Sequence, residues 1–232
     1  MAVSPDDFPA WVPAAVKKVA SQLGYEEELI RRLVTDIRMK SIWQYLNRRS
    51  VQVTDPESLF LIEFFGVATM GVSSSQQACA VFFYNLVFEL SIPHVTLTHT
   101  EVSSIIKSWQ TAAEQCRLAI VDRDLRSGEL AAALNLVSKF FDGEIDSLTV
   151  RSANNPYIIS RRSNRRDDDT VRGRVRALAL LNRNLYGEYL YTILATVATV
   201  ALETNVTIKD VRNWCKDLQS NDQTLQVASD LS

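Results

Sequence analysis

Arginine is the residue type whose number and spacing most strongly suggest chemistry in this sequence. The window "SRRSNRRDDDTVRGRVRALAL", residues 160–180, holds seven arginines and three successive aspartates. Extended to Arg183, the segment carries a charge of +5, so the rest of the chain carries −7, since the formal net charge is −2. A guanidinium group forms paired hydrogen bonds with phosphates and carboxylates. This segment is therefore the first candidate for a binding surface.

The spacing of the arginines predicts a helix with a basic ridge over residues 171–185. At about 100° per residue, its valines and leucines form one apolar stripe, and Arg172, Arg176 and Arg183 gather on a separate face. Arg174 falls near the apolar stripe and must reach water or find a partner. The aspartates at 167–169 are stabilised by the positive end of the helix dipole. The candidate partner- or phosphate-binding residues are Arg151, Arg161, Arg162, Arg165, Arg166, Arg172, Arg176 and Arg183.

Three interpretations of these arginines remain open. In the first, they engage an acidic surface of another protein or of a second copy of the chain, and opposite charge then sets the register of the contact. In the second, they bind the phosphates of DNA or RNA, which makes the affinity strongly salt-dependent. In the third, the segment is solvated and its arginines pair with nearby acids. The aspartates weigh against the nucleic-acid interpretation, because they repel phosphate.

The residues needed for catalysis or for metal binding are sparse. His94 and His99 are five residues apart, a spacing that does not place two histidines on one helix face or one strand face. No C-x-x-C pair, phosphate-binding GxxxxGK[ST] loop or GxGxxG turn occurs. The sequence therefore predicts no cofactor and no metal, and it favours a non-enzymatic protein. A helical enzyme whose site is assembled from distant residues is the third alternative, after an interaction protein and a nucleic-acid binder.

The elements that position these residues are expected to be helices. Hydrophobic residues make up 47% of the chain and charged residues 22%, as in ordinary globular proteins, and glycine and proline are few. Apolar residues recur at helical spacing, so we expect a mainly α, multi-helix globular bundle. Capping pairs are expected at Thr98–Glu101, Thr207–Asp210 and Ser73–Gln76. The expected helices lie near 12–23, 26–48, 56–70, 74–91, 99–126, 129–141, 169–185, 188–203 and 208–219.

Residues 147–162 depart from the helical pattern. Two β-prone runs flank Asn154-Asn155-Pro156, and both asparagine and a residue before proline favour turns. A small β-hairpin or an extended arm is therefore expected at about 147–162. We divide the chain into a helical core over 1–146, a basic hairpin or loop excursion over 147–168, and C-terminal helices over 169–232. The last part is expected to pack on the same core, which gives one domain overall.

The chain is expected to be cytoplasmic and to have no contact with a membrane. Its first residues, "MAVSPDDFPAWVPAAV", lack the cationic start and apolar run of a signal peptide. The three cysteines are far apart and odd in number, which is typical of a reducing compartment. The apolar run from Tyr189 to Leu202 is shorter than the roughly 20 residues that a membrane span needs, so it is expected to be a buried helix. The expected function is that of a helical interaction or regulatory protein acting through the arginine segment.

Overall fold

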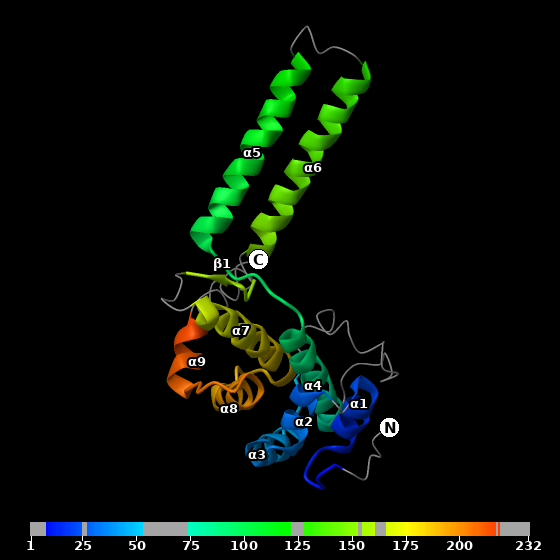
Figure 1. The fold of residues 1–232 in the computed structure, drawn as a ribbon, viewed down its shortest axis with the longest axis vertical. Helices are drawn as coiled ribbons and strands as arrows, with labels where there is room; N and C mark the ends of the chain where they lie inside the picture. The colour runs from blue at the N-terminus through cyan, green and yellow to red at the C-terminus, as the bar shows by residue number, and fades with distance from the viewer. Residues whose placement is uncertain are drawn as a thin grey trace, which may run out of the picture. The chain divides into compact units, whose positions relative to one another are not determined.

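The computed structural model describes residues 8–24, 27–52, 74–121, 128–152, 155–160, 166–216 and 218. The described part of the chain is mainly helical, with nine helices and one sheet of two short parallel strands (Figure 1). This confirms the prediction of a mainly α, multi-helix protein. The helix expected near 56–70 lies outside the described residues.

The chain divides into two compact units. Among the described residues, unit 1 comprises 8–94 and 170–218, and unit 2 comprises 95–169. Unit 1 therefore joins two segments of the chain that are separated by residues 95–169. The sequence-based division has boundaries near residues 147 and 169 and does not contain the one at residue 94.

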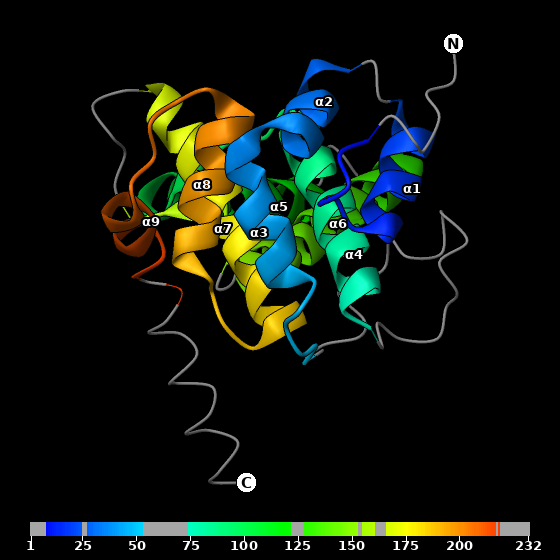
Figure 2. The same ribbon diagram turned by 90° about the horizontal axis from the view of Figure 1, so that it is seen from below.

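Unit 1 is a layer of helices that pack on one another in a fixed order. Figure 2 shows α1, α4, α3, α8 and α9 following one another across the unit, with α2 packed on α3 and α8. The α4 helix is apolar on nearly all sides and buries eight residues, since neighbours cover more than one of its faces. The helices of this unit are α1 (Ala14–Leu23), α2 (Glu28–Thr35), α3 (Ile37–Leu46), α4 (Ser75–Ser91), α7 (Arg166–Tyr186, from residue 170), α8 (Tyr191–Leu202) and α9 (Ile208–Trp214).

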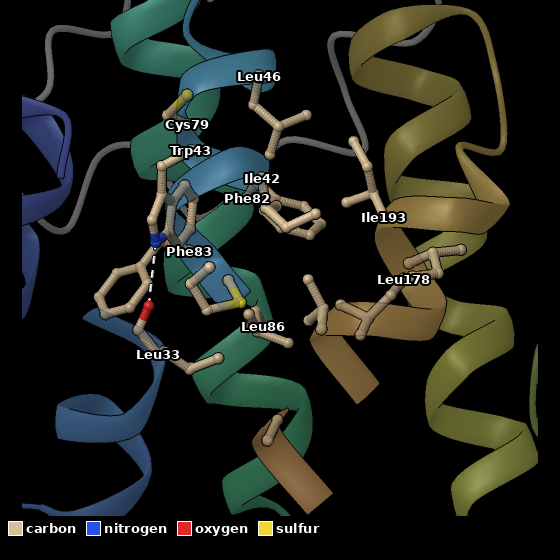
Figure 3. Packing of buried hydrophobic residues seen from close by; sticks show 14 of the residues in the cluster. Leu33, Ile42, Trp43, Leu46, Cys79, Phe82, Phe83, Leu86, Leu178 and Ile193 are labelled. Atoms are coloured by element: carbon tan, nitrogen blue, oxygen red, sulfur yellow. Dashed lines mark hydrogen bonds between the residues drawn. The ribbon is translucent and has the colours of Figure 1, made fainter. Parts of the chain in front are cut away.

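The centre of unit 1 is an aromatic cluster around Trp43. The Trp43 ring packs edge-on against Phe82 and Phe83, with ring centroids 6.2 and 6.0 Å apart (Figure 3). Its Nε1 donates a hydrogen bond of 3.0 Å to the Leu33 carbonyl oxygen. Because a buried indole N–H needs an acceptor, this bond fixes the orientation of the ring and ties α3 to α2.

The α8 helix is the buried helix that the sequence predicts over 189–202. Seven of its twelve residues are buried, and the hydroxyls of Thr196 and Thr199 donate to the carbonyl oxygens four residues earlier. None of the helices in the described ranges is long and apolar enough to cross a membrane.

The helix ends follow the capping signals of the sequence, with one shift and one added break. Thr207 and Asp210 form a reciprocal capping box, as predicted, and Glu101 accepts hydrogen bonds from the backbone N–H and hydroxyl of Thr98. At α4 the capping pair is Ser74–Gln77, one residue later than expected. The single helix expected over 26–48 is divided at Asp36, which is extended (ψ 126°) and caps α3 by accepting from the Arg38 N–H.

Unit 2 is a long antiparallel pair of helices, α5 (His99–Val121) and α6 (Gly128–Ser152), with strands β1 (Leu97–Thr98) and β2 (Ile158–Ile159) at one end (Figure 1). The strands pair in parallel, Leu97 opposite Ile158. The β-hairpin expected at 147–162 is therefore wrong for residues 147–152, which continue α6. Ile145 and Leu148 carry on the helical apolar spacing there, and this spacing outweighs the local β propensity.

Candidate functional site

Arg176 is buried, in contrast to the expectation that it faces water. Only 3% of the residue is exposed, and its Nη1 donates a hydrogen bond of 2.8 Å to the carbonyl oxygen of Trp214. Trp214 is the last residue of α9, so the guanidinium group lies at the negative end of that helix. The predicted ridge on α7 is thus covered at its centre by the end of α9. Helical periodicity alone does not reveal such a cover.

Arg172 and Arg183 are both partly buried and both engaged within the protein. The guanidinium of Arg183 lies 5.7 Å over the centre of the Tyr189 ring. Arg174, which the sequence places near the apolar stripe, has the partner that this position requires, because its Nη2 lies 3.4 Å from the Ile92 carbonyl oxygen. The α7 helix therefore does not present Arg172, Arg176 and Arg183 together as free cations.

The remaining arginines of the candidate set are placed only in part. Arg151 lies in the last turn of α6, and Arg166 is the first residue of α7. Arg161, Arg162 and Arg165 lie outside the described residues. A contact of these five arginines with an acidic surface or with phosphates stays a prediction.

The histidines and cysteines do not form a reactive centre in the described part of the chain. His94 Nε2 lies 3.2 Å from a carboxylate oxygen of Glu89. Burial raises the pKa of the Cys79 thiol to about 12, which keeps it protonated at neutral pH, and Cys215 is fully buried. The described ranges contain no group of three residues able to hold a metal ion.

An open groove of about 720 Å³ lies between α3, the segment 187–193 and α9. The rings of Tyr189 and Tyr191 stack in its lining, with centroids 5.7 Å apart. Its one carboxylate, on Glu188, is paired with Arg49 at 2.6 Å. No cysteine or histidine of the described residues lines the groove, so its hydroxyl groups, such as those of Ser41 and Thr192, have no histidine beside them to act as a base.

The α5–α6 pair is held together by a seam of the coiled-coil type. On each helix the seam residues are spaced alternately three and four apart, which keeps them on one side of the helix. Val102, Ala113 and the polar Ser138 are the buried residues of the pair. The seam consists of Val102, Ile106, Trp109, Ala113, Cys116 and Ile120 on α5, and of Ala131, Leu134, Ser138, Phe141, Ile145 and Leu148 on α6.

One side of this helical hairpin carries most of the charged residues in its middle part. Arg117 donates to both carboxylate oxygens of Asp142, at 2.7 Å each, and lies 3.3 Å from Glu114. These hydrogen bonds raise the pKa of the Arg117 guanidinium. Because Arg117 is on α5 and Asp142 is on α6, the ion pair identifies one side of the hairpin that both helices share. We name this side, with Lys107, Glu114, Arg117, Lys139 and Asp142, the charged face.

The opposite side of the hairpin is apolar between Ala133 and Phe140 of α6, and no charged residue of that stretch lies on it. On α6, Leu136 is 73% exposed, Phe140 63% and Val137 41%. With Ala133 these residues have the i, i+3, i+4, i+7 spacing of a helix face, and they point away from the seam. On α5, Ile105, Ala112 and Ala119 lie on this same side of the hairpin. They are roughly 60–100° around the helix from the seam, in the direction away from Arg117. We name this side the neutral face; it consists of Ile105, Ala112, Ala119, Ala133, Leu136, Val137 and Phe140.

The neutral face was not among the candidate sites drawn from the sequence. The expected helix ended at residue 141, and its apolar residues were all assigned to one core. The signal that could have found it is the double set of apolar positions between residues 130 and 148. A helix with two apolar stripes requires two partners, whereas α5 supplies only one.

No protein-family model, no curated protein and no solved structure matches this chain.

Proposed function

We propose that the protein is a non-enzymatic helical interaction protein and that the α5–α6 hairpin is its docking arm. The observation that carries this proposal is the neutral face, above all the exposure of Leu136, Val137 and Phe140. Burying side chains of this kind contributes about 1.5–3 kcal/mol each. A partner that covers all three therefore gains several kcal/mol, which offsets part of the cost of association.

The distribution of charge on the hairpin supports the same function. The central parts of protein interfaces are depleted in charged residues and enriched in aromatic ones. Phe140 provides the aromatic residue, and the ion pair of Arg117 with Asp142 lies on the far side. Between residues 104 and 119, the charged residues of α5 all lie on that far side.

The arginine segment provides a second proposed contact, with an acidic protein surface or, as an alternative, with nucleic acid. We restrict it to Arg151, Arg161, Arg162, Arg165 and Arg166, since Arg172, Arg176 and Arg183 are engaged inside the protein. A mobility-shift assay with unspecific DNA and RNA at low salt tests the alternative. Binding that falls steeply with salt supports it, and the absence of a complex at low salt removes it.

Site-specific photocrosslinking in cells that express the full chain tests the docking arm. Phe140 is replaced by p-benzoylphenylalanine, and the control carries the same group at Lys139, on the charged face of the same helix. We expect a discrete covalent adduct with a second chain from position 140 and none from position 139. Equal adducts from both positions, or none from position 140, would contradict a docking function for the neutral face.

A further inference from the structure

We infer that the partner of the neutral face is a second copy of this chain, so that two α5–α6 hairpins form a four-helix bundle. This inference rests on the proposed docking function and names its partner. A helix pair with one covered seam and a second, uncovered apolar side is half of such a bundle.

The sizes of the side chains on the neutral face favour a second copy over an unrelated helix. Three of the four residues contributed by α6, Leu136, Val137 and Phe140, are large and exposed. Those contributed by the middle and tip of α5 are small, Ala112 and Ala119. A two-fold axis parallel to the hairpin places α6 of each copy on α5 of the other, so large side chains meet small ones at both contacts. Neighbouring helices then all run antiparallel, as in up-down bundles.

The charges are compatible with this pairing over most of its length. Between residues 104 and 119 the charged residues of α5 all lie on the charged face, and the side chains that border its neutral face are Ser104, Ser108, Thr111 and Gln115. Burial of this stretch of α5 therefore removes no charge of α5 itself from water. Glu144 lies at the end of the neutral face nearer the strands. It follows the apolar residues of α6, and the two-fold axis brings like carboxylates closer together at that end.

The mass of the purified full chain in solution tests this inference. Light scattering after size exclusion, at about 1 to about 100 μM, should give twice the chain mass of 26.1 kDa at the upper concentrations. Leu136→Glu combined with Phe140→Glu should raise the dissociation constant at least about 100-fold. The matched control, Gln110→Glu with Asn135→Glu, adds the same charge to the other side of the hairpin and should remain dimeric. Circular dichroism shows whether both variants keep their helical content.

Glu144→Gln tests the two-fold arrangement through an increase in dimer affinity, which a misfolded variant would not show. Removing the carboxylate should tighten the dimer by roughly two- to fivefold, the range of exposed charge interactions. A dimer that Glu144→Gln weakens would overturn the parallel arrangement of the hairpins. If the control variant dissociates the dimer and the Leu136/Phe140 variant leaves it intact, the two copies meet through another surface.

The two proposals fail in different ways. A chain that remains at 26.1 kDa at the highest concentration, but whose position 140 crosslinks to another protein in cells, overturns the second copy and leaves the docking arm standing. A crosslink from position 140 to unit 1 or to residues 220–232 of the same chain overturns both. A crosslink to α5 of a second copy supports both.

Discussion

The buried guanidinium of Arg176 leads to the sharpest prediction, because it decides whether this arginine acts in folding or in binding. Arg176→Met keeps most of the aliphatic stem and removes the donor to the Trp214 carbonyl oxygen, which accepts at 2.8 Å. The Arg176 residue is 3% exposed, so water does not replace the lost bond.

The expected loss of stability follows from that geometry. A hydrogen bond to a charged group contributes about 1.5–3 kcal/mol, and its loss leaves the end of α9 without its cation. We therefore expect Arg176→Met to lower the free energy of unfolding by about 2 kcal/mol. In a unit of this size that corresponds to a melting temperature roughly 4–8 °C lower.

Urea denaturation followed by tryptophan fluorescence measures this change. Arg212→Met is the matched control, since Arg212 is an exposed arginine on α9 itself and should change stability by less than about 0.5 kcal/mol. The two variants should also bind nucleic acid, or fail to bind it, as the wild type does. If Arg176→Met is as stable as Arg212→Met, the assignment of Arg176 to the fold is refuted.

Three further substitutions probe the fold. Asn182 is fully buried, and neither polar atom of its side chain has a hydrogen-bond partner among the described residues. Asn182→Leu should therefore raise the free energy of unfolding by about 1 kcal/mol or more. A lower free energy of unfolding in urea denaturation would argue for a hydrogen-bond partner of Asn182 outside the described residues. Trp43→Phe removes the hydrogen bond to the Leu33 carbonyl oxygen and part of the ring, and it should lower the free energy of unfolding by about 1–3 kcal/mol. An unchanged denaturation midpoint would show that this hydrogen bond does not stabilise the fold. Hydrogen bonds from Thr207 lower the pKa of the Asp210 carboxyl, so the carboxylate stabilises the folded state above its ordinary pKa of 3.8 and this stabilisation is lost as pH falls. Asp210→Asn should therefore cost about 1 kcal/mol near pH 7 and less near pH 4, and thermal melts at both values that gave an equal cost would contradict the capping role.

The sequence predicts most helices of this protein because their signals are local. Apolar spacing marks α1, α4, α7 and α8 to within a few residues, and hydroxyl–carboxylate pairs such as Thr207–Asp210 mark where helices begin. The break at Asp36 was missed because its flanking residues continue the helical spacing. Only the capping of the Arg38 N–H by Asp36 reveals it.

The features that the sequence did not reveal depend on contacts between distant segments. Arg176 lies on what periodicity marks as a polar face, and the end of α9, 38 residues later, covers it. The pairing of Leu97 with Ile158 joins residues on either side of the hairpin. The neutral face could not be recognised from the sequence because α6 has two apolar stripes and only one of them faces α5. The contact between Arg117 and Asp142 identifies which one it is.

The insertion of residues 95–169 within unit 1 affects the order in which parts of unit 1 can fold during synthesis. Helices α2 and α3 pack on α8, which begins at Tyr191, and so must wait until the intervening chain has been synthesised. At about 5–20 residues per second this delay is on the order of ten seconds. During this delay the surfaces of α2 and α3 that α8 covers remain exposed to solvent. The α5–α6 hairpin is continuous and is complete as soon as Ser152 has left the exit tunnel.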